Sequence, residues 1–138
     1  MVSASHAHLV QRVVDEIWNA GDLDLADELF GRTYVNHGGL VPDLVCGPES
    51  VKFSVALYRM AFPNLHIWAD ELRASGGMVT LRWTARAGSN NSDGVRTRGD
   101  ALTGSTKFSV IGDQIVESWT SWNSAAVLEK LGVAPRMG

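Results

Sequence analysis

Cysteine is almost absent from this sequence, which has one thiol, Cys46, among 138 residues. A lone cysteine excludes an intrachain disulfide, and it leaves no partner for a thiolate metal cluster. His6 and His8 lie two residues apart near the N-terminus without a partner at helical spacing, so we expect them to be solvated. The sequence therefore predicts no metal site.

Positive charge is also scarce, because 12 Lys and Arg residues stand against 15 Asp and Glu residues, for a formal net charge of -3. This balance gives no electrostatic attraction to nucleic acid, and no run of basic residues forms a local patch. No apolar stretch approaches the roughly 18 residues of a membrane-spanning helix, and the N-terminus lacks a basic start followed by an apolar core. We therefore expect a cytoplasmic protein that binds a small molecule, with no nucleic-acid or membrane partner.

The length and the hydrophobic content of 45% predict one domain, residues 1–138, with its own core. Apolar residues recur at intervals of three and four over 5–19, the period of an amphipathic helix, and Gly21 follows its end. Residues 23–30 predict a second, short helix. Pro48 suits the first turn of a third helix over 48–61.

Beyond residue 63 the apolar pattern changes from helical to extended. We expect strands over 65–74, 78–87, 96–102, 106–111 and 114–123, after a short extended segment at 34–37. The turn residues at 75–77 and 112–113 predict tight hairpins. Helices gathered first and strands gathered later predict an α+β fold, in which the N-terminal helices cover a curved antiparallel sheet and a short helix closes the chain.

The segment 113–132, DQIVESWTSWNSAAVLEKLG, predicts one wall of a pocket, because a strand with tryptophans and hydrogen-bonding groups leads into the closing helix. Steps of two residues along the strand separate two faces. One face would carry Ile115, Glu117, Trp119, Ser121 and Asn123, and the other Val116, Ser118, Thr120 and Trp122. The alternative is a central strand whose tryptophans fill the core.

Two groups in the sequence are candidates for proton transfer. His37 follows Tyr34 and Asn36, and an imidazole titrates close to neutral pH; the alternative is a hydrogen-bonded structural histidine. Asp100 lies two residues from Arg98, so an extended backbone would place both side chains on one face, with the guanidinium holding the carboxylate in its ionised form. The alternative for this pair is a surface ion pair.

Two further charged residues are candidates for contact with a substrate. Arg82 lies on the face opposite Leu81 and Trp83, where it could stabilise an enolate or carboxylate oxygen; otherwise it is a solvated charge at a sheet edge. Glu117 shares a face with Trp119 and is a candidate buried carboxyl group. Its alternative role is that of a structural partner for an arginine on a neighbouring strand.

Six segments carry a family pattern in their order and spacing: WNAGDLDLADELF (18–30), YVNHGG (34–39), GPESVKFSVALYRMAFPNLHIWADEL (47–72), VTLRWTARAG (79–88), TGSTKFSVIGDQIVESW (103–119) and LEKLG (128–132). Together they resemble the SnoaL-like polyketide cyclase family, within the wider fold shared by nuclear transport factor 2 and ketosteroid isomerase. The resemblance implies an NTF2-like α+β cone, frequently dimeric, whose interior binds small, often polycyclic molecules without a metal or an organic cofactor. We therefore expect a homodimer with an apolar small-molecule substrate.

The resemblance departs from the family at one chemically important position. In SnoaL-like cyclases an aspartate four residues after the strand tryptophan acts as acid and base in an intramolecular aldol closure, and here that position is Asn123. An amide cannot take up a proton near neutral pH.

A second resemblance is to limonene epoxide hydrolase, of the same fold, which uses an Arg-x-Asp pair, a Tyr-x-Asn pair and a further aspartate. The pairs Arg98–Asp100 and Tyr34–Asn36 are similar to the first two, while Ser121 stands at the position of the third group.

These observations leave three hypotheses open. The leading one is a cyclase or isomerase that moves protons within an apolar oxygenated ring compound, with His37 and Asp100 as acid and base. In it Tyr34 and Asn36, together with Asn123, hold the substrate oxygen, and Trp119 shapes the pocket. The runner-up is epoxide opening, which Arg98 beside Asp100 favours and Ser121 disfavours. The third is a noncatalytic binding module, which Asn123 and Ser121 favour because both lack a carboxylate.

Overall fold

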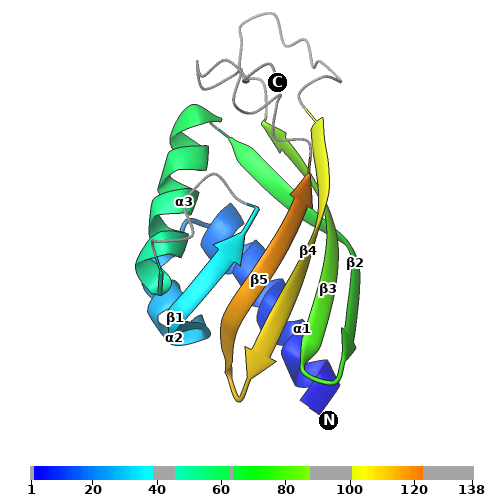
Figure 1. The fold of residues 1–138 in the computed structure, drawn as a ribbon. Coiled ribbons are helices and arrows are strands. Elements are labelled where there is room, and N and C mark those ends of the chain that lie inside the picture. The colour runs from blue at the N-terminus through cyan, green and yellow to red at the C-terminus, as the bar shows by residue number, and fades with distance from the viewer. Residues whose placement is uncertain (1, 39–45, 63, 88–100, 123–138) are drawn as a thin grey trace, which may run out of the picture.

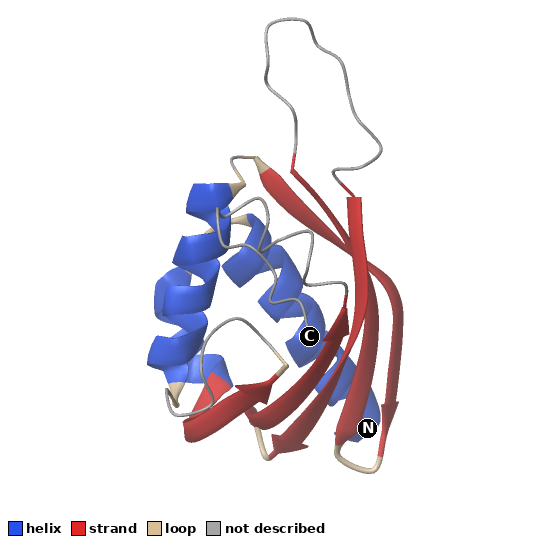
Figure 2. Ribbon diagram, turned by 45° about the horizontal axis from the view of Figure 1, so that its top comes forward, coloured by secondary structure: helices blue, strands red, loops and turns tan. Residues whose placement is uncertain are grey.

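A layer of helices lies against one face of a curved five-stranded sheet (Figures 1 and 2). The structure, a computed structural model, describes residues 2–38, 46–62, 64–87 and 101–122. The helical elements are α1 (Val2–Arg12), a π-helical segment (Val13–Asn19), a 3-10 turn (Leu23–Leu25), α2 (Ala26–Leu29) and α3 (Pro48–Ala61). The strands are β1 (Phe30–His37), β2 (Leu65–Ser75), β3 (Met78–Ala87), β4 (Ala101–Ile111) and β5 (Gln114–Trp122).

The sheet has the order β1-β5-β4-β3-β2, so the last described strand, β5, lies between β1 and β4. The strands from β2 to β5 are antiparallel neighbours, whereas β1 pairs with β5 in parallel. The sheet is therefore mixed where the sequence predicted an antiparallel one. A parallel pair needs a long crossover, and the chain between β1 and β5 supplies it.

The predicted elements agree with the structure in type, and most differences concern their ends. The α+β architecture, the third helix over 48–61 and the hairpins at 75–77 and 112–113 are confirmed. The strand predicted at 34–37 begins at Phe30, and the strands predicted at 96–102 and 106–111 form one strand from Ala101. Residues 96–100 and the predicted closing helix lie outside the described residues.

The first helix changes from α to π geometry at Val13, and its C-terminal end is hydrogen-bonded to β2 and to α3. The side chain of Asn19 donates to the carbonyl of Ile67 at 2.9 Å and accepts from the backbone N–H of Ile67 at 2.7 Å, which joins it to β2. Arg59 of α3 donates to the carbonyls of Trp18 at 2.7 Å and Asn19 at 3.1 Å. The contacts from Arg59 satisfy carbonyl groups that a helix end leaves without partners.

The core lies between the helices and the inner face of the sheet. The most buried side chains come from both layers: Val10, Ile17 and Val55 from the helices, and Val79 and Ile115 from the strands. Burial of such side chains is the main favourable term in folding, about 1.5–3 kcal/mol each. No helix among the described residues is long and apolar enough to cross a membrane.

Candidate functional site

An apolar cavity opens between the helices and the inner face of the sheet. It has two adjoining lobes, of about 130 Å³ and about 90 Å³. Both lobes are lined by Val13, Trp18, Asn36, Thr106, Phe108 and Thr120. The first lobe is mostly aromatic and aliphatic, and the second reaches the hydroxyl groups of Tyr34 and Ser118. An apolar body with a few convergent polar groups is typical of a small-molecule site.

Two tryptophans of the first lobe pack over a glycine. Gly104 of β4 pairs with Trp83 on one side and Trp122 on the other, and the two indole rings lie 6.1 Å apart. A Cβ atom at Gly104 would come within 2.3 Å of the Trp83 ring. The absence of a side chain at Gly104 therefore allows the indole of Trp83 to lie across β4. The indole of Trp122 is held in place by a hydrogen bond from its Nε1 to the carbonyl of Gly38, at 2.9 Å.

A line of hydrogen bonds crosses the cavity wall from β3 to β1. Trp83 Nε1 donates to Thr106 Oγ1 at 3.0 Å, and Thr106 Oγ1 lies 3.2 Å from Thr120 Oγ1. Thr120 Oγ1 donates to Asn36 Oδ1 at 3.0 Å. The line continues from Asn36 through Ser118 to Tyr34.

Asn36 Oδ1 accepts a second hydrogen bond, from Ser118 Oγ at 2.8 Å. Ser118 Oγ lies 2.7 Å from the hydroxyl of Tyr34, which is buried. Burial raises the pKa of Tyr34 to about 12, although the hydrogen bond with Ser118 acts in the opposite direction. Tyr34 is therefore a protonated hydroxyl at any physiological pH and cannot serve as a base.

The described cavity wall contains no carboxylate, imidazole, amine or guanidinium side chain. Its titratable side chains within the described ranges are those of Tyr34 and Tyr58. Hydroxyl, amide and indole groups can bind and orient an oxygen, but near neutral pH they cannot take up a proton. Of the predicted acid and base candidates, Asp100 lies outside the described residues, as do Arg98 and Asn123.

A bulge in β5 decides which of its residues face the cavity. Ile115 pairs with Val110 and Glu117 with Ser109, so Val116 is an extra residue between two pairs. An extra residue interrupts the alternation of faces. Buried Ile115 and buried Ser118 therefore both face the core, and Thr120 and Trp122 line the cavity. Among the described residues of the predicted face, only Ile115 is placed wrongly, because the alternation does not continue through the bulge. Glu117, Trp119 and Ser121 do share one face, and it is the face away from the cavity.

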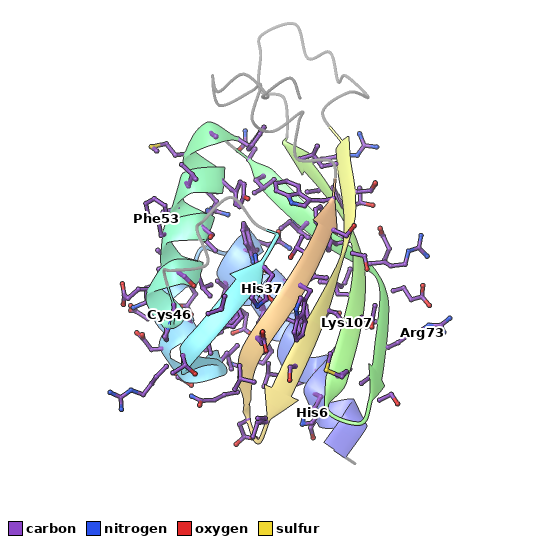
Figure 3. The ribbon with its side chains drawn as sticks, in the orientation of Figure 1. His6, His37, Cys46, Phe53, Arg73 and Lys107 are labelled. Carbon is purple, nitrogen blue, oxygen red and sulfur yellow. The ribbon has the colours of Figure 1, made fainter. Side chains whose placement is uncertain are left out.

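His37 lies at the end of β1 beside β5 (Figure 3), on the outer face of the sheet, with two other predicted site residues. Its Nε2 is 2.7 Å from Glu117 Oε2, and its ring stacks on Trp119 with centroids 5.8 Å apart. The side chains of His37 and Glu117 are 36% and 42% exposed, and Trp119 is 40% exposed. The structure thus brings these three residues together, on the face opposite the cavity residue Asn36.

The remaining predicted contact residues also lie away from the cavity. Ser121 is exposed. Arg82 forms an ion pair with Glu71 at 3.1 Å, with its side chain 67% exposed. Hydrogen bonds from Arg73 and then Arg82 lower the pKa of Glu71. This arrangement matches the surface-charge alternative for Arg82.

The cavity also contains residues that the sequence analysis did not select as site residues. Ser118, Thr120 and Thr106 carry the hydrogen bonds to Asn36, and Trp83 supplies an N–H at the end of the line. The adjacent apolar pair Ile115 and Val116 is the sequence signal that could have indicated the bulge. No group of three or more His, Cys, Asp or Glu side chains is placed to hold a metal ion among the residues that the structure describes. The expectation that His6 is solvated is wrong, because α1 packs against β2 and β3 and leaves His6 only 7% exposed.

Solved structures of similar fold cover nearly the whole chain. A candidate polyketide cyclase from Bacillus cereus matches with a TM-score of 0.73 and 21% identity, over 93% of this chain and 80% of its own. IdmH, a candidate polyketide cyclase from Streptomyces antibioticus, matches with a TM-score of 0.69 and 24% identity, over 91% and 97%. AclR, a candidate hydroxylase from Streptomyces galilaeus, matches with a TM-score of 0.67 and 23% identity, over 96% and 99%.

No curated protein sequence matches the chain significantly. The family model for SnoaL-like polyketide cyclases matches residues 8–131. The match includes every described strand and the helices that line the cavity. The chain therefore belongs to the SnoaL-like polyketide cyclase family.

Proposed function

We propose that the chain binds an apolar ring compound bearing a carbonyl oxygen and catalyses proton transfer within it, as in cyclase or isomerase chemistry. The observation that carries the proposal is an apolar cavity whose wall converges on one amide, Asn36. A hydrogen-bond donor at a carbonyl stabilises the negative charge that develops there when an adjacent C–H proton is removed. Asn36 is therefore the residue to which we assign the substrate oxygen.

We assign the proton transfer to Asp100. Tyr34 stays protonated, and His37 lies on the outer face of the sheet with Glu117. In an intramolecular aldol closure the carboxylate of Asp100 takes the proton from the carbon beside the substrate carbonyl. That carbon then attacks a second carbonyl of the same molecule, and the proton passes to the new alkoxide. The reaction needs no external oxidant or reductant.

Two alternatives have specific support. A noncatalytic binding module is favoured by the absence of a carboxylate or imidazole from the described cavity wall. Epoxide opening is favoured by the pair Tyr34 and Asn36, because Ser118 joins their side chains inside the cavity. It too would depend on Asp100, here as the group that activates water. A homodimer and a cytoplasmic location remain predictions.

Turnover of polyketide-like diketones, and separately of cyclic epoxides, by the purified protein tests these proposals. We expect cyclisation of the diketone, its loss in Asp100→Asn, and retention of ligand binding in that variant. Asp113→Asn is the matched control, since Asp113 is exposed in the β4–β5 turn. Turnover unaffected by Asp100→Asn would contradict the assigned base. Binding without turnover of either class supports the binding module.

A further inference from the structure

The two ends of the hydrogen-bond line in the cavity are both donors. An indole N–H can only donate, so at one end Trp83 Nε1 gives its proton to Thr106 Oγ1. At the other end the hydroxyl of Tyr34 is buried, and Ser118 is the acceptor that the described residues offer it. The directions of all the intermediate bonds follow from these two ends.

The protons of the line point from both ends toward Asn36. Thr106 accepts from Trp83 and passes its own proton to Thr120, which donates to Asn36 Oδ1. Ser118 accepts from Tyr34 and donates to the same oxygen. Asn36 Oδ1 therefore receives two hydrogen bonds, and its Nδ2 group remains as a donor.

The reversed orientation of the Asn36 amide would disrupt both arms. If Nδ2 donated to Ser118 and Thr120, one hydroxyl proton in each arm would have no acceptor among the described residues. In the arm of Ser118 both hydroxyl groups are buried, since Ser118 is 1% and Tyr34 is 5% exposed, so water cannot readily take the proton that lacks an acceptor. When Oδ1 faces the hydroxyl groups, every hydroxyl proton in both arms has an acceptor.

The Nδ2 group of Asn36 is open to the cavity. Among the described residues, His6 Nδ1 is the one fully buried side-chain nitrogen or oxygen without a partner, so Asn36 Nδ2 is not sealed inside the protein. No described residue accepts a hydrogen bond from it, and Asn36 lines both lobes. An N–H group directed into an apolar cavity needs an acceptor from the ligand.

We propose that Tyr34 and Trp83 are positioning residues, because their donated protons fix the direction of the line and so hold Asn36 with its N–H group toward the cavity. A ligand that presents an N–H donor at Asn36 is then disfavoured relative to one that presents an acceptor oxygen. The inference rests on the proposed function, because it names the residues that set the donor at that same cavity. It adds a specificity that a merely apolar cavity would not have.

Three bicyclic probes of similar shape separate these properties: 1-indanone presents an acceptor, indole presents a donor, and indane presents neither. Each is titrated into ¹⁵N-labelled protein and followed by NMR chemical shifts. We expect 1-indanone to bind about tenfold more tightly than indane, and indole to bind no more tightly than indane. Indole binding as tightly as 1-indanone would overturn the donor assignment alone. Absence of binding by all three probes would contradict the proposed function itself.

Variants test the positioning role through the ratio of the 1-indanone and indole affinities. Tyr34→Phe and Trp83→Phe each remove one terminal donor, and we expect each to reduce the ratio by about threefold and the double variant to bring it close to one. Thr103→Val is the matched control, because Thr103 is an exposed hydroxyl of β4 and its loss should leave the ratio unchanged. The spectrum of each variant without ligand shows whether it is folded. A folded double variant that keeps the wild-type ratio would refute the positioning role.

Discussion

Replacement of Gly104 by alanine should displace the indole of Trp83 and deform the cavity. The new Cβ would lie 2.3 Å from one ring carbon and 2.8 Å from two others, whereas ordinary contacts begin at 3.4 Å, so the ring must move by more than 1 Å. The ring is rigid, and its Nε1 atom, which is bonded to one of the contacted carbons, is held by Thr106. The backbone of Gly104 is not in the left-handed region, so the cost is steric.

The magnitude follows from overpacking and from the lost hydrogen bond. Forcing an extra methyl group into a packed core costs about 1–3 kcal/mol, and loss of the bond from Trp83 to Thr106 adds about 1 kcal/mol. We therefore expect Gly104→Ala to lower the free energy of unfolding by about 2–4 kcal/mol, measured by urea denaturation. The near-UV circular dichroism of the tryptophans should change with it, and 1-indanone should bind more weakly.

Two comparisons make this prediction specific. Gly31→Ala is the matched control, since Gly31 is a strand glycine outside the left-handed region whose Cβ would be 3.3 Å from a methyl group of Val116. We expect its effect to be below about 1 kcal/mol. In a Trp83→Leu background, Gly104→Ala should cost much less than in the wild type. Wild-type stability and an unchanged near-UV spectrum in Gly104→Ala would refute the steric argument.

Three further predictions concern other parts of the structure. Burial raises the pKa of Tyr34 to about 12, from about 10 in an unfolded chain. The contribution of this hydroxyl group to the free energy of unfolding is therefore fully present below pH 10 and is lost as the pH rises toward 12. Between pH 10 and pH 12 the free energy of unfolding of the wild type should fall by up to about 2.7 kcal/mol more than that of Tyr34→Phe, measured by urea denaturation at each pH. Equal falls in the two proteins would contradict the raised pKa. His6→Leu removes a buried nitrogen without a partner and should raise the free energy of unfolding by about 1 kcal/mol in the same assay, whereas a marked loss would show an essential contact of the imidazole. Asn19→Ala removes both hydrogen bonds to Ile67 and should cost about 1–3 kcal/mol, while the surface control Gln11→Ala should stay within about 0.5 kcal/mol.

Local patterns in the sequence predicted the element types well because local physics determines them. Pro48 and the residues that follow suit a helix N-terminus, and α3 spans the predicted residues. The glycines at 76, 77 and 112 adopt positive φ in the predicted hairpin turns. The parallel pairing of β1 with β5 had no local signal, because it joins segments about 80 residues apart.

Two of the residues that the sequence singled out, Tyr34 and Asn36, line the cavity. His37 is the next residue after Asn36 on the same strand, so the alternation along β1 directs it to the opposite face. The partners of Asn36 come from β5, and the bulge at Val116 changed which residues of that strand could reach it.

The sequence by itself determined the α+β class, the helix and strand periods and the family, because these depend on local propensity and on the order of segments. The tertiary structure alone decided which strand faces are enclosed, since a single extra residue in β5 reverses the faces that follow it. It also decided the direction of the hydrogen bonds that end at Asn36. That direction depends on donors from β3 and β1 that meet only when the sheet is assembled.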